Sequence, residues 1–262
     1  MTRKRNSMLD YKASEGRATI TINDPERRNP ISVETMAGLL EATQRAVDDG
    51  SVKVIVYTGA GDEVFSAGGD LSGSFVDDAV GLHQKRGVFA DLLRLMWRSG
   101  KPTVARVNGH ALAGGFGLAV ACDITICVDD ARLGTTEVTV GLWPMMITAA
   151  LARSMPRKAL LEMMLTGRTI DAQEAYRLGA VSRVVMRSEL DSAVDDIVAR
   201  LQSLSPATLM LGRDVFQGVS DVGVDAALDR LQLGLTEVAM SEDASEGIAA
   251  FLEKRDPRWL GG

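Results

Sequence analysis

The sequence contains few residues that build covalent or metal-bound frameworks. Only two cysteines and two histidines occur among its 262 residues. Cys122 and Cys127 lie close together in an apolar run, which is typical of buried reduced thiols and not of a disulfide scaffold. His83 and His110 are far apart and lack the spacing of metal ligands. These shortages argue against a disulfide-rich secreted fold and against a metal site, and they favour a cytoplasmic protein.

The sequence also lacks an excess of positive charge and a long apolar run. The net charge is −6, and lysine and arginine are scattered, so the basic surface of a nucleic-acid-binding protein is missing. Residues 1–16 are polar and basic, without the apolar segment of a secretion signal. No apolar stretch reaches the roughly 18 uncharged residues that a membrane helix needs. We therefore expect no nucleic acid partner, no membrane segment and no signal peptide.

What is present is enough apolar sequence for a large core. Hydrophobic residues make up 46% and charged residues 24%, as in ordinary globular proteins. A helical stripe that follows Ser32, a predicted N-cap, extends to position 47, and a second covers 84–98. Four runs have the pattern of strands: 17–24, 52–59, 101–109 and 123–130. Such alternation of strands and helices predicts an α/β fold with largely parallel strands.

The last third of the chain has a different pattern. Apart from a strand-like run at 180–185, it consists of helical stripes, and Asp171 with Glu174 predicts a capping box on a helix that ends at Gly179. Further helices are predicted over 189–203, 206–217, 222–240 and 243–254. We expect an α/β core over residues 1–200 and a helical region over 201–262. The apolar faces of the terminal helices suit either a partner subunit or the chain's own core.

Two glycine-rich turns carry the main functional signal. "FSAGGDL" (65–71) follows a predicted strand, and "ALAGGFGLAVACD" (111–123) opens a short helix. The second turn partly matches a dinucleotide fingerprint, but Val120 replaces the third glycine and no crossover helix fits before the next strand. Glycine lets a backbone N–H approach a ligand at a helix start, where donors are unpaired. Two such turns can direct one N–H each at a single oxygen, which is the construction of an oxyanion hole.

These turns belong to a longer set of matching segments. In order and spacing, "FSAGGDL", "KPTVARVNGHALAGGFGLAVACDITIC", "LGTTEVTVGLWP", "LTGRTIDAQEAYRLGAVSRVV" and "EGIAAFLEKR" resemble the crotonase (enoyl-CoA hydratase/isomerase) superfamily over residues 15–258. The resemblance implies a crotonase-like α/β spiral of ββα units with a C-terminal helical trimerisation region, assembled as a trimer or a dimer of trimers (a hexamer). It also implies an acyl-CoA thioester substrate. Since CoA is part of that substrate, no metal or redox cofactor is expected.

The resemblance assigns roles to four residues of the catalytic centre. The backbone N–H groups of Gly69 and Gly114 would bind the thioester carbonyl and stabilise an enolate. Glu137 would act as acid and base, its pKa raised by desolvation in an apolar pocket. Hydratases of the family typically carry another glutamate 20 residues earlier, where this sequence has Gly117. A glutamate placed at position 117 is expected to raise hydration if the pocket accepts it.

The resemblance also implies a set of substrate-binding residues. Arg27 and Arg28 match a segment near the CoA phosphates, Lys254 matches a lysine that reaches the nucleotide from a neighbouring subunit, and Phe251 matches a pocket aromatic. Trp143 is expected to line the acyl pocket with Met145 and Met146, or else to pack in the core. The backbone of the first glycine turn is expected to flank adenine and pantetheine through Ala67, Gly68, Asp70, Leu71 and Ser72. Asp70 alternatively caps the helix after that turn.

The expected function is therefore an acyl-CoA-processing enzyme of the enoyl-CoA hydratase type, a lyase of the kind found in fatty acid metabolism. It would add water to a 2-enoyl-CoA through an enolate, with a single glutamate as acid and base. One alternative is isomerisation of a 3-enoyl-CoA to a 2-enoyl-CoA, because a double-bond shift needs only one base. Another is a non-catalytic acyl-CoA-binding homologue. The sequence does not specify acyl chain length, branching, pathway, or trimer against hexamer.

Overall fold

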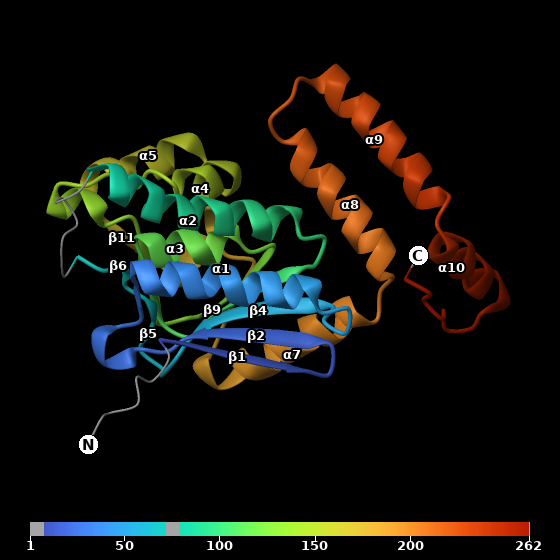
Figure 1. Cartoon of the computed structure of the whole chain (residues 1–262), viewed down its shortest axis with the longest axis horizontal. Coiled ribbons are helices and arrows are strands. Elements are labelled where there is room, and N and C mark those ends of the chain that lie inside the picture. Colours follow the sequence, from blue (N-terminus) through green and yellow to red (C-terminus); the bar gives the residue numbers. More distant parts are fainter. Residues whose placement is uncertain (1–7, 72–78, 262) are drawn as a thin grey trace.

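A six-stranded sheet forms the centre of the structure, a computed structural model that describes residues 8–71 and 79–261 (Figure 1). β1 pairs antiparallel with β2, and the other neighbouring strands pair in parallel. All six residues of β4 are buried, as expected for a parallel strand covered on both faces. In sheet order the strands are β1 (Leu9–Ser14), β2 (Arg17–Ile22), β4 (Val54–Gly59), β7 (Thr103–Val107), β9 (Ile124–Val128) and β12 (Arg183–Val185).

Helices cover both faces of this sheet. α1 (Val33–Asp48) packs on β1 and β2, and α2 (Ala79–Arg98) packs beside α1. α7 (Leu190–Gln202) lies on the opposite face, against β4, β7 and β9 (Figure 1). The predicted N-cap of α1 is confirmed, because the Ser32 hydroxyl accepts a hydrogen bond from Thr35 N at 3.1 Å. The sheet and its helices enclose one core.

A smaller four-stranded sheet positions the candidate site. Its order is β11 (Thr169–Asp171), β10 (Arg132–Gly134), β8 (His110–Leu112) and β5 (Val64–Ser66). β5, β8 and β10 are mutually parallel, and β11 runs antiparallel to β10. β3 (Pro30–Ile31) and β6 (Gly68–Gly69) form a separate parallel pair. Because parallel strands run in one direction, the segments after β5, β8 and β10 leave the sheet at the same edge.

The short helix α3 (Gly114–Ala121) follows β8 and is almost entirely buried. Its glycines allow close packing on its surroundings. A β-carbon at Gly115 would lie 2.5 Å from Ser66 O, and one at Gly117 would lie 2.0 Å from Ile147 Cγ2. Ile147 is buried just before α4 (Thr148–Ser154). Its side chain fills the space that any side chain at position 117 would need.

The remaining elements of the body are short. α5 (Arg157–Thr166) follows α4, and α6 (Ala172–Arg177) follows β11. Three single-turn 3₁₀ helices are η1 (Pro25–Arg27), η2 (Glu137–Val140) and η3 (Arg187–Glu189). Within the described ranges, no helix combines the length and the apolar character required to cross a membrane.

Three helices project from the body and form what we call the C-terminal arm, residues 206–253 (Figure 1). They are α8 (Pro206–Val219), α9 (Val224–Ala239) and α10 (Glu242–Glu253). Arg213 of α8 anchors the arm, since its Nε donates to both carboxylate oxygens of Asp123 at 2.8 and 2.9 Å. Its NH2 group donates to Met96 O at 2.5 Å. The ion pair is largely buried, so it holds the base of the arm firmly on the body.

The structure confirms most of the predicted elements and corrects two details. The four predicted N-terminal strands correspond to β2, β4, β7 and β9, and the terminal helices to α7 through α10. The capping box is only half formed. Asp171 accepts from Glu174 N at 2.7 Å, but the Glu174 carboxylate accepts from Arg168 at 2.9 Å instead of returning to the N-cap. α2 begins at Ala79, five residues before the predicted start.

β1 has no counterpart in the sequence prediction. Its sequence LDYKAS alternates apolar and polar residues, but four of its six residues are exposed, and the sequence analysis treated this segment only as part of a polar, basic N-terminus. The hairpin to β2 is made by Glu15 and Gly16, both with positive φ (51° and 74°). A two-residue loop with positive φ at both positions is a type I′ turn, whose twist matches that of the flanking strands. The Glu15–Gly16 turn therefore pairs β1 with β2 as an edge strand of the sheet.

Gly117→Ala is expected to destabilise the protein, although alanine normally favours a helix. The new methyl group overlaps Ile147, and such overpacking costs about 1–3 kcal/mol. The matched control is Gly87→Ala in α2, where a β-carbon meets no atom within 4 Å. There the free energy of unfolding should rise by about 0.5–1 kcal/mol. Denaturant unfolding of both variants measures the difference, and equal effects would contradict the packing described for α3.

Candidate active site

Three neighbouring strands deliver the three residues predicted to form the catalytic centre. Gly69 follows β5, Gly114 follows β8, and Glu137 follows β10. The register pairs Ser66 with Ala111 and Leu112 with Gly134, so the strand ends are aligned. In open α/β sheets, the edge at the carboxyl ends of parallel strands is where ligands bind. The topology therefore brings these segments, which are far apart in sequence, to one edge.

The two glycine-rich turns are in direct contact. A β-carbon at Gly68 would lie 2.6 Å from Ala113 Cβ and 3.0 Å from Gly114 N. A β-carbon at Gly114 would lie 3.9 Å from Gly69 N. Gly68 also has a φ of +91°, which residues other than glycine rarely adopt. Glycine at position 68 is thus required both for the turn and for the approach of the second turn.

Both turns are partly accessible at the surface, since Gly69 is exposed and Gly114 is half-buried. Gly114 is the first residue of α3, and amides of a first helical turn have no acceptor within the helix. The first such bond of α3 runs from Gly117 N to Ala113 O, at 3.1 Å. Gly69 is exposed, and a β-carbon there would meet no atom within 4 Å. The space next to the Cα of Gly69 is therefore open.

Ala113, the residue before α3, has a strained backbone. Its φ of 49° and ψ of −125° lie in a region that alanine rarely occupies. Its N–H donates to Gly134 O at 2.8 Å, which ties the turn before Gly114 to the end of β10. Strain of this kind persists only where the surroundings enforce it, and it often occurs at functional sites. The bond also places the Glu137 segment beside the second glycine turn.

Glu137 begins η2 and is partly buried. Its Oε2 atom is buried and has no hydrogen-bond partner within the described part of the chain. Burial raises the pKa of the Glu137 carboxyl, an effect that a hydrogen bond from its own backbone N–H partly offsets. A carboxyl group with a raised pKa and an unoccupied oxygen is suited to accept a proton and to return it.

Position 117 lies on the same helix as Gly114 but has no room for a second carboxylate. The Cγ2 and Cβ atoms of Ile147 would lie 2.0 and 2.3 Å from a β-carbon there. The sequence analysis left open whether the pocket accepts a glutamate at this position. The structure shows that it does not unless Ile147 moves. Ile147 and the strained Ala113 were not singled out from the sequence, because neither is marked by residue type or spacing.

The first set of predicted binding residues lies beside the glycine turn. Arg27 donates to Asp70 at 2.5 Å. The expectation that Asp70 caps the following helix concerns residues before α2 that lie outside the described ranges. The Arg28 side chain is exposed, and its carbonyl accepts from Ala67 N at 3.0 Å. Pairing of β3 with β6 fixes the two segments side by side.

The other predicted binding residues are spread more widely. Leu71 is exposed, and Ser72 lies outside the described residues. Trp143 and Met146 pack against the core, whereas Met145 is 71% exposed.

Phe251 and Lys254 are not near this edge within one chain. Phe251 is 82% exposed on α10, and Lys254 is the left-handed residue that ends this helix. α10 and β6 lie at opposite ends of the molecule (Figure 1). A single chain therefore does not bring these two residues together with Glu137.

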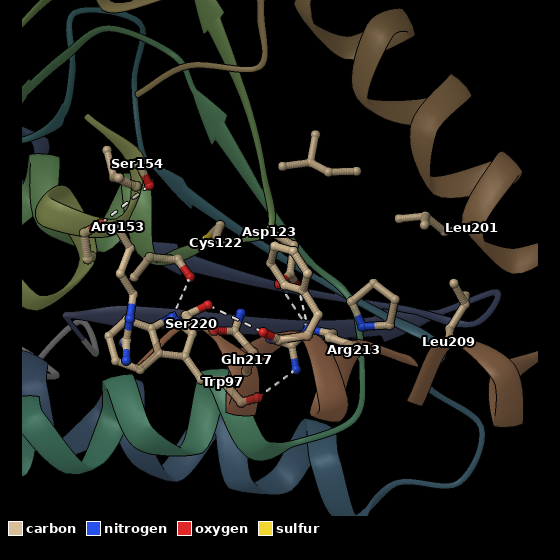
Figure 2. A pocket seen from close by; sticks show the side chains of 16 residues that line it. Trp97, Cys122, Asp123, Arg153, Ser154, Leu201, Leu209, Arg213, Gln217 and Ser220 are labelled. Carbon is tan, nitrogen blue, oxygen red and sulfur yellow. Dashed lines mark hydrogen bonds and ion pairs between the residues drawn. The ribbon is translucent and has the colours of Figure 1, made fainter. Parts of the chain in front are cut away.

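A cavity lies elsewhere in the structure. It measures about 430 Å³ and lies between α8 and the ends of α2, α3 and α4. Figure 2 shows Arg213 and Asp123 paired within it. Trp97 Nε1 donates to Ala121 O at 3.1 Å. Because its main charges pair with one another, we interpret it as the junction of arm and body. Glu137 and the glycine turns do not line it.

No metal centre is found in residues 8–71 and 79–261, where no three histidine, cysteine, aspartate or glutamate side chains are grouped to hold an ion. Nδ1 of His110 accepts a hydrogen bond from Arg132 N at 3.0 Å. Cys122 and Cys127 are buried and unbonded to each other, and burial raises the pKa of both thiols. We therefore interpret His110, Cys122 and Cys127 as structural residues.

Comparison with known proteins agrees with this geometry. The family model for enoyl-CoA hydratase/isomerase matches residues 12–262. A putative enoyl-CoA hydratase of Thermus thermophilus is 36% identical over 245 residues, which cover 92% of this chain and 96% of that protein. A carnitinyl-CoA dehydratase of Proteus mirabilis is 34% identical, covering 92% and 94%.

Solved structures give the same result. The crystal structure of an enoyl-CoA hydratase of Mycobacterium smegmatis superposes with a TM-score of 0.92 at 31% identity, covering 96% of this chain and 98% of that one. The fold is therefore the crotonase fold. The chain belongs to the enoyl-CoA hydratase/isomerase family.

Proposed function

We propose that this protein is an enoyl-CoA hydratase that uses Glu137 as its only catalytic carboxylate. The observation that carries the proposal is the buried, unpartnered Oε2 of Glu137 at the sheet edge where the two glycine turns meet. Membership of the family supports an acyl-CoA substrate. The similarity to proteins described as hydratase and dehydratase supports addition of water over other reactions of the family.

In the proposed mechanism, the N–H groups of Gly69 and Gly114 donate to the thioester carbonyl oxygen of a 2-enoyl-CoA. They stabilise the negative charge that develops there when water attacks C3. Glu137 accepts the proton of the attacking water and then transfers a proton to C2, which completes the 3-hydroxyacyl thioester. This sequence of steps requires no metal and no redox cofactor.

The substrate would lie along the first glycine turn. We assign the CoA moiety to the first glycine turn, along Ala67, Gly68, Asp70 and Leu71, with Arg27 and Arg28 near its phosphates. Ser72, which is also expected to flank the CoA, lies outside the described residues. Trp143 would border the acyl chain, since it packs at the surface of the core just beyond η2. The Arg27–Asp70 ion pair would hold the arginine in place beside the ligand.

The C-terminal arm is proposed to assemble the protein as a trimer or a dimer of trimers. Along α9, Leu228, Leu231 and Leu235 recur at helical spacing and are 59%, 44% and 71% exposed. Large exposed apolar surfaces of this kind mark interfaces. Assembly would also bring Phe251 and Lys254 of one subunit to the CoA site of another. With two buried free thiols, the proposed location is the cytoplasm.

Isomerisation of a 3-enoyl-CoA is the second candidate. One observation favours it, namely the Ile147 side chain that fills the space beside Gly117 and leaves a single carboxylate. A double-bond shift moves one proton between two carbons, which one base can do. Incorporation of oxygen from labelled water distinguishes the two reactions, because only hydration adds water oxygen to the product.

Glu137→Gln is expected to lower kcat/KM for hydration by about 10²–10⁴-fold, because the amide can neither accept nor return the proton. Acyl-CoA binding should be retained. The matched control is Glu41→Gln, which changes an exposed glutamate of α1 and should leave the rate unchanged. Steady-state kinetics on 2-enoyl-CoA and 3-enoyl-CoA provide the measurement. If wild type and Glu137→Gln are equally inactive on every thioester they bind, the protein is a binder and not an enzyme.

The hydration rate is expected to fall in acid at a pH above the ordinary glutamate pKa. Glu137 must be ionised to accept the proton of water, and its pKa is raised by burial above 4.5. The acid limb of a kcat/KM profile should therefore lie above pH 4.5. A limb at or below the ordinary value would show that another group controls the reaction.

Leu231→Glu with Leu235→Glu is expected to convert the assembly into monomers, because two charges would be buried at the interface. The control is Tyr176→Glu, at an exposed position of α6 on the body. Light scattering coupled to size-exclusion chromatography measures the mass. A wild-type monomer, or a double variant that keeps the wild-type mass, would contradict an interface on this face of α9.

A further inference from the structure

Asn29 is a completely buried polar residue in the link between η1 and β3. Its φ is 52°, and that of Arg28 before it is 66°, so two successive residues lie in the left-handed region. Residues with a β-carbon rarely adopt this conformation, and asparagine tolerates it better than most. The backbone at position 29 is therefore one that few side chains allow.

The side chain of Asn29 joins segments that are distant in sequence. Its Nδ2 group donates to Val64 O at 2.8 Å and to Ala60 O at 3.0 Å, and its Oδ1 atom accepts from Asp24 N at 3.0 Å. These neighbours fix the orientation of the amide, because the reverse orientation would place Oδ1 against two carbonyl oxygens. Loss of this side chain would remove three hydrogen bonds and leave the joined segments less firmly held.

The segments that Asn29 joins meet the first glycine turn at two places. Val64 is the first residue of β5, which leads into the turn. β3 begins directly after Asn29 and pairs in parallel with β6, with Ile31 opposite Gly69. One side chain thus connects the strand that enters the turn with the strand that pairs along it.

β3 also contacts the second glycine turn. A β-carbon at Gly114 would lie 3.7 Å from Ile31 Cδ1 and 3.9 Å from Gly69 N. Ile31 is buried and lies two positions after Asn29. A shift of β3 would therefore disturb the place where the two turns meet.

We propose that Asn29 is a positioning residue for the oxyanion hole, an inference that rests on the proposed function. It holds β5 and β3 in a fixed relation, so that Gly69 N and Gly114 N donate to one thioester oxygen. Such donors lower the reaction barrier because they are in place before charge develops. A misplacement of about 1 Å can cost about 10²-fold in rate. Asn29 acts through the backbone, contacts no substrate and exchanges no proton.

Other residues at position 29 meet only part of this requirement. Glycine adopts the left-handed conformation readily but makes no side-chain hydrogen bond. Ionised aspartate has the size of asparagine and an acceptor oxygen, but it has no donor for the two carbonyl oxygens. Asparagine combines the conformation, the two donors and the acceptor, and these two replacements separate its contributions.

Asn29→Gly is expected to lower kcat for hydration by about 10–100-fold, because the Gly69 amide loses its fixed position. KM should change less than kcat. Asn29→Asp removes only the donors and should have the same effect, which provides the test if the glycine variant does not fold. The matched control is Thr43→Val in α1, where the buried hydroxyl bonds Leu39 O at 2.7 Å and Tyr57 OH at 2.8 Å. That variant should melt at a lower temperature than the wild type and hydrate at the wild-type rate.

A second measurement reports on the oxyanion hole in the folded protein alone. Hydrogen bonds weaken a carbonyl bond and lower its stretching frequency. Infrared difference spectra of bound butanoyl-CoA, labelled with carbon-13 at the thioester carbonyl, therefore compare the donors in each variant. The frequency should be higher in Asn29→Gly than in the wild type, and Thr43→Val should match the wild type.

The inference is wrong if the Asn29 variants hydrate at the wild-type rate, or if their carbonyl frequency equals that of the wild type. It is also wrong if Thr43→Val loses as much kcat as Asn29→Gly, because the loss would then follow stability and not position. A wild-type protein that binds butanoyl-CoA but hydrates no 2-enoyl-CoA would instead remove the proposed function itself.

Discussion

The contact between two backbone turns is the constraint on which the candidate site depends. Gly68 and the Ala113–Gly114 turn approach so closely that no side chain fits between them. The contact exists because β5 and β8 are adjacent parallel strands that end together, and Ala113 N links the same turn to β10 through Gly134 O. The small sheet, whose strands are three residues long, thereby sets the positions of the Gly69 and Gly114 amides and of the Glu137 carboxylate, which are far apart in sequence.

Features of this edge reduce stability and fit a binding or catalytic role. Ala113 is held in a backbone conformation that alanine disfavours, and Glu137 keeps a buried oxygen without a partner. Other polar groups are paired, such as the carboxylate of Asp123 with Arg213 and Thr103, although the Tyr11 hydroxyl also lacks a hydrogen-bond partner among the described residues. A strained backbone at Ala113 and an unpartnered buried carboxylate oxygen at Glu137, in neighbouring segments, fit a site shaped for something other than folding.

Long periodic segments could be predicted from the sequence, whereas short or irregular ones could not. β4 and α1 have enough buried residues at the right spacing to fix their type and approximate bounds. The three-residue strands of the small sheet are too short to show a period, so the element that positions the site was missed. Gly69, Gly114 and Glu137 were predicted through their spacing in a family pattern, and their catalytic roles stay a prediction. The importance of Ile147 arises only from its contact with Gly117, 30 positions away, which no local pattern reveals.

The Gly117–Ile147 contact also limits how this chain can change over evolution. A lineage that acquired a glutamate at position 117 by one codon change would first meet the Ile147 side chain and lose stability. Replacement of Ile147 by a smaller residue, without a glutamate at position 117, would leave a void in the core and bring no second carboxylate. The two substitutions are therefore epistatic, each harmful without the other. A descendant with glutamates at both 117 and 137 would have to pass through a destabilised single mutant. Single substitutions alone will therefore tend to preserve the form with Gly117.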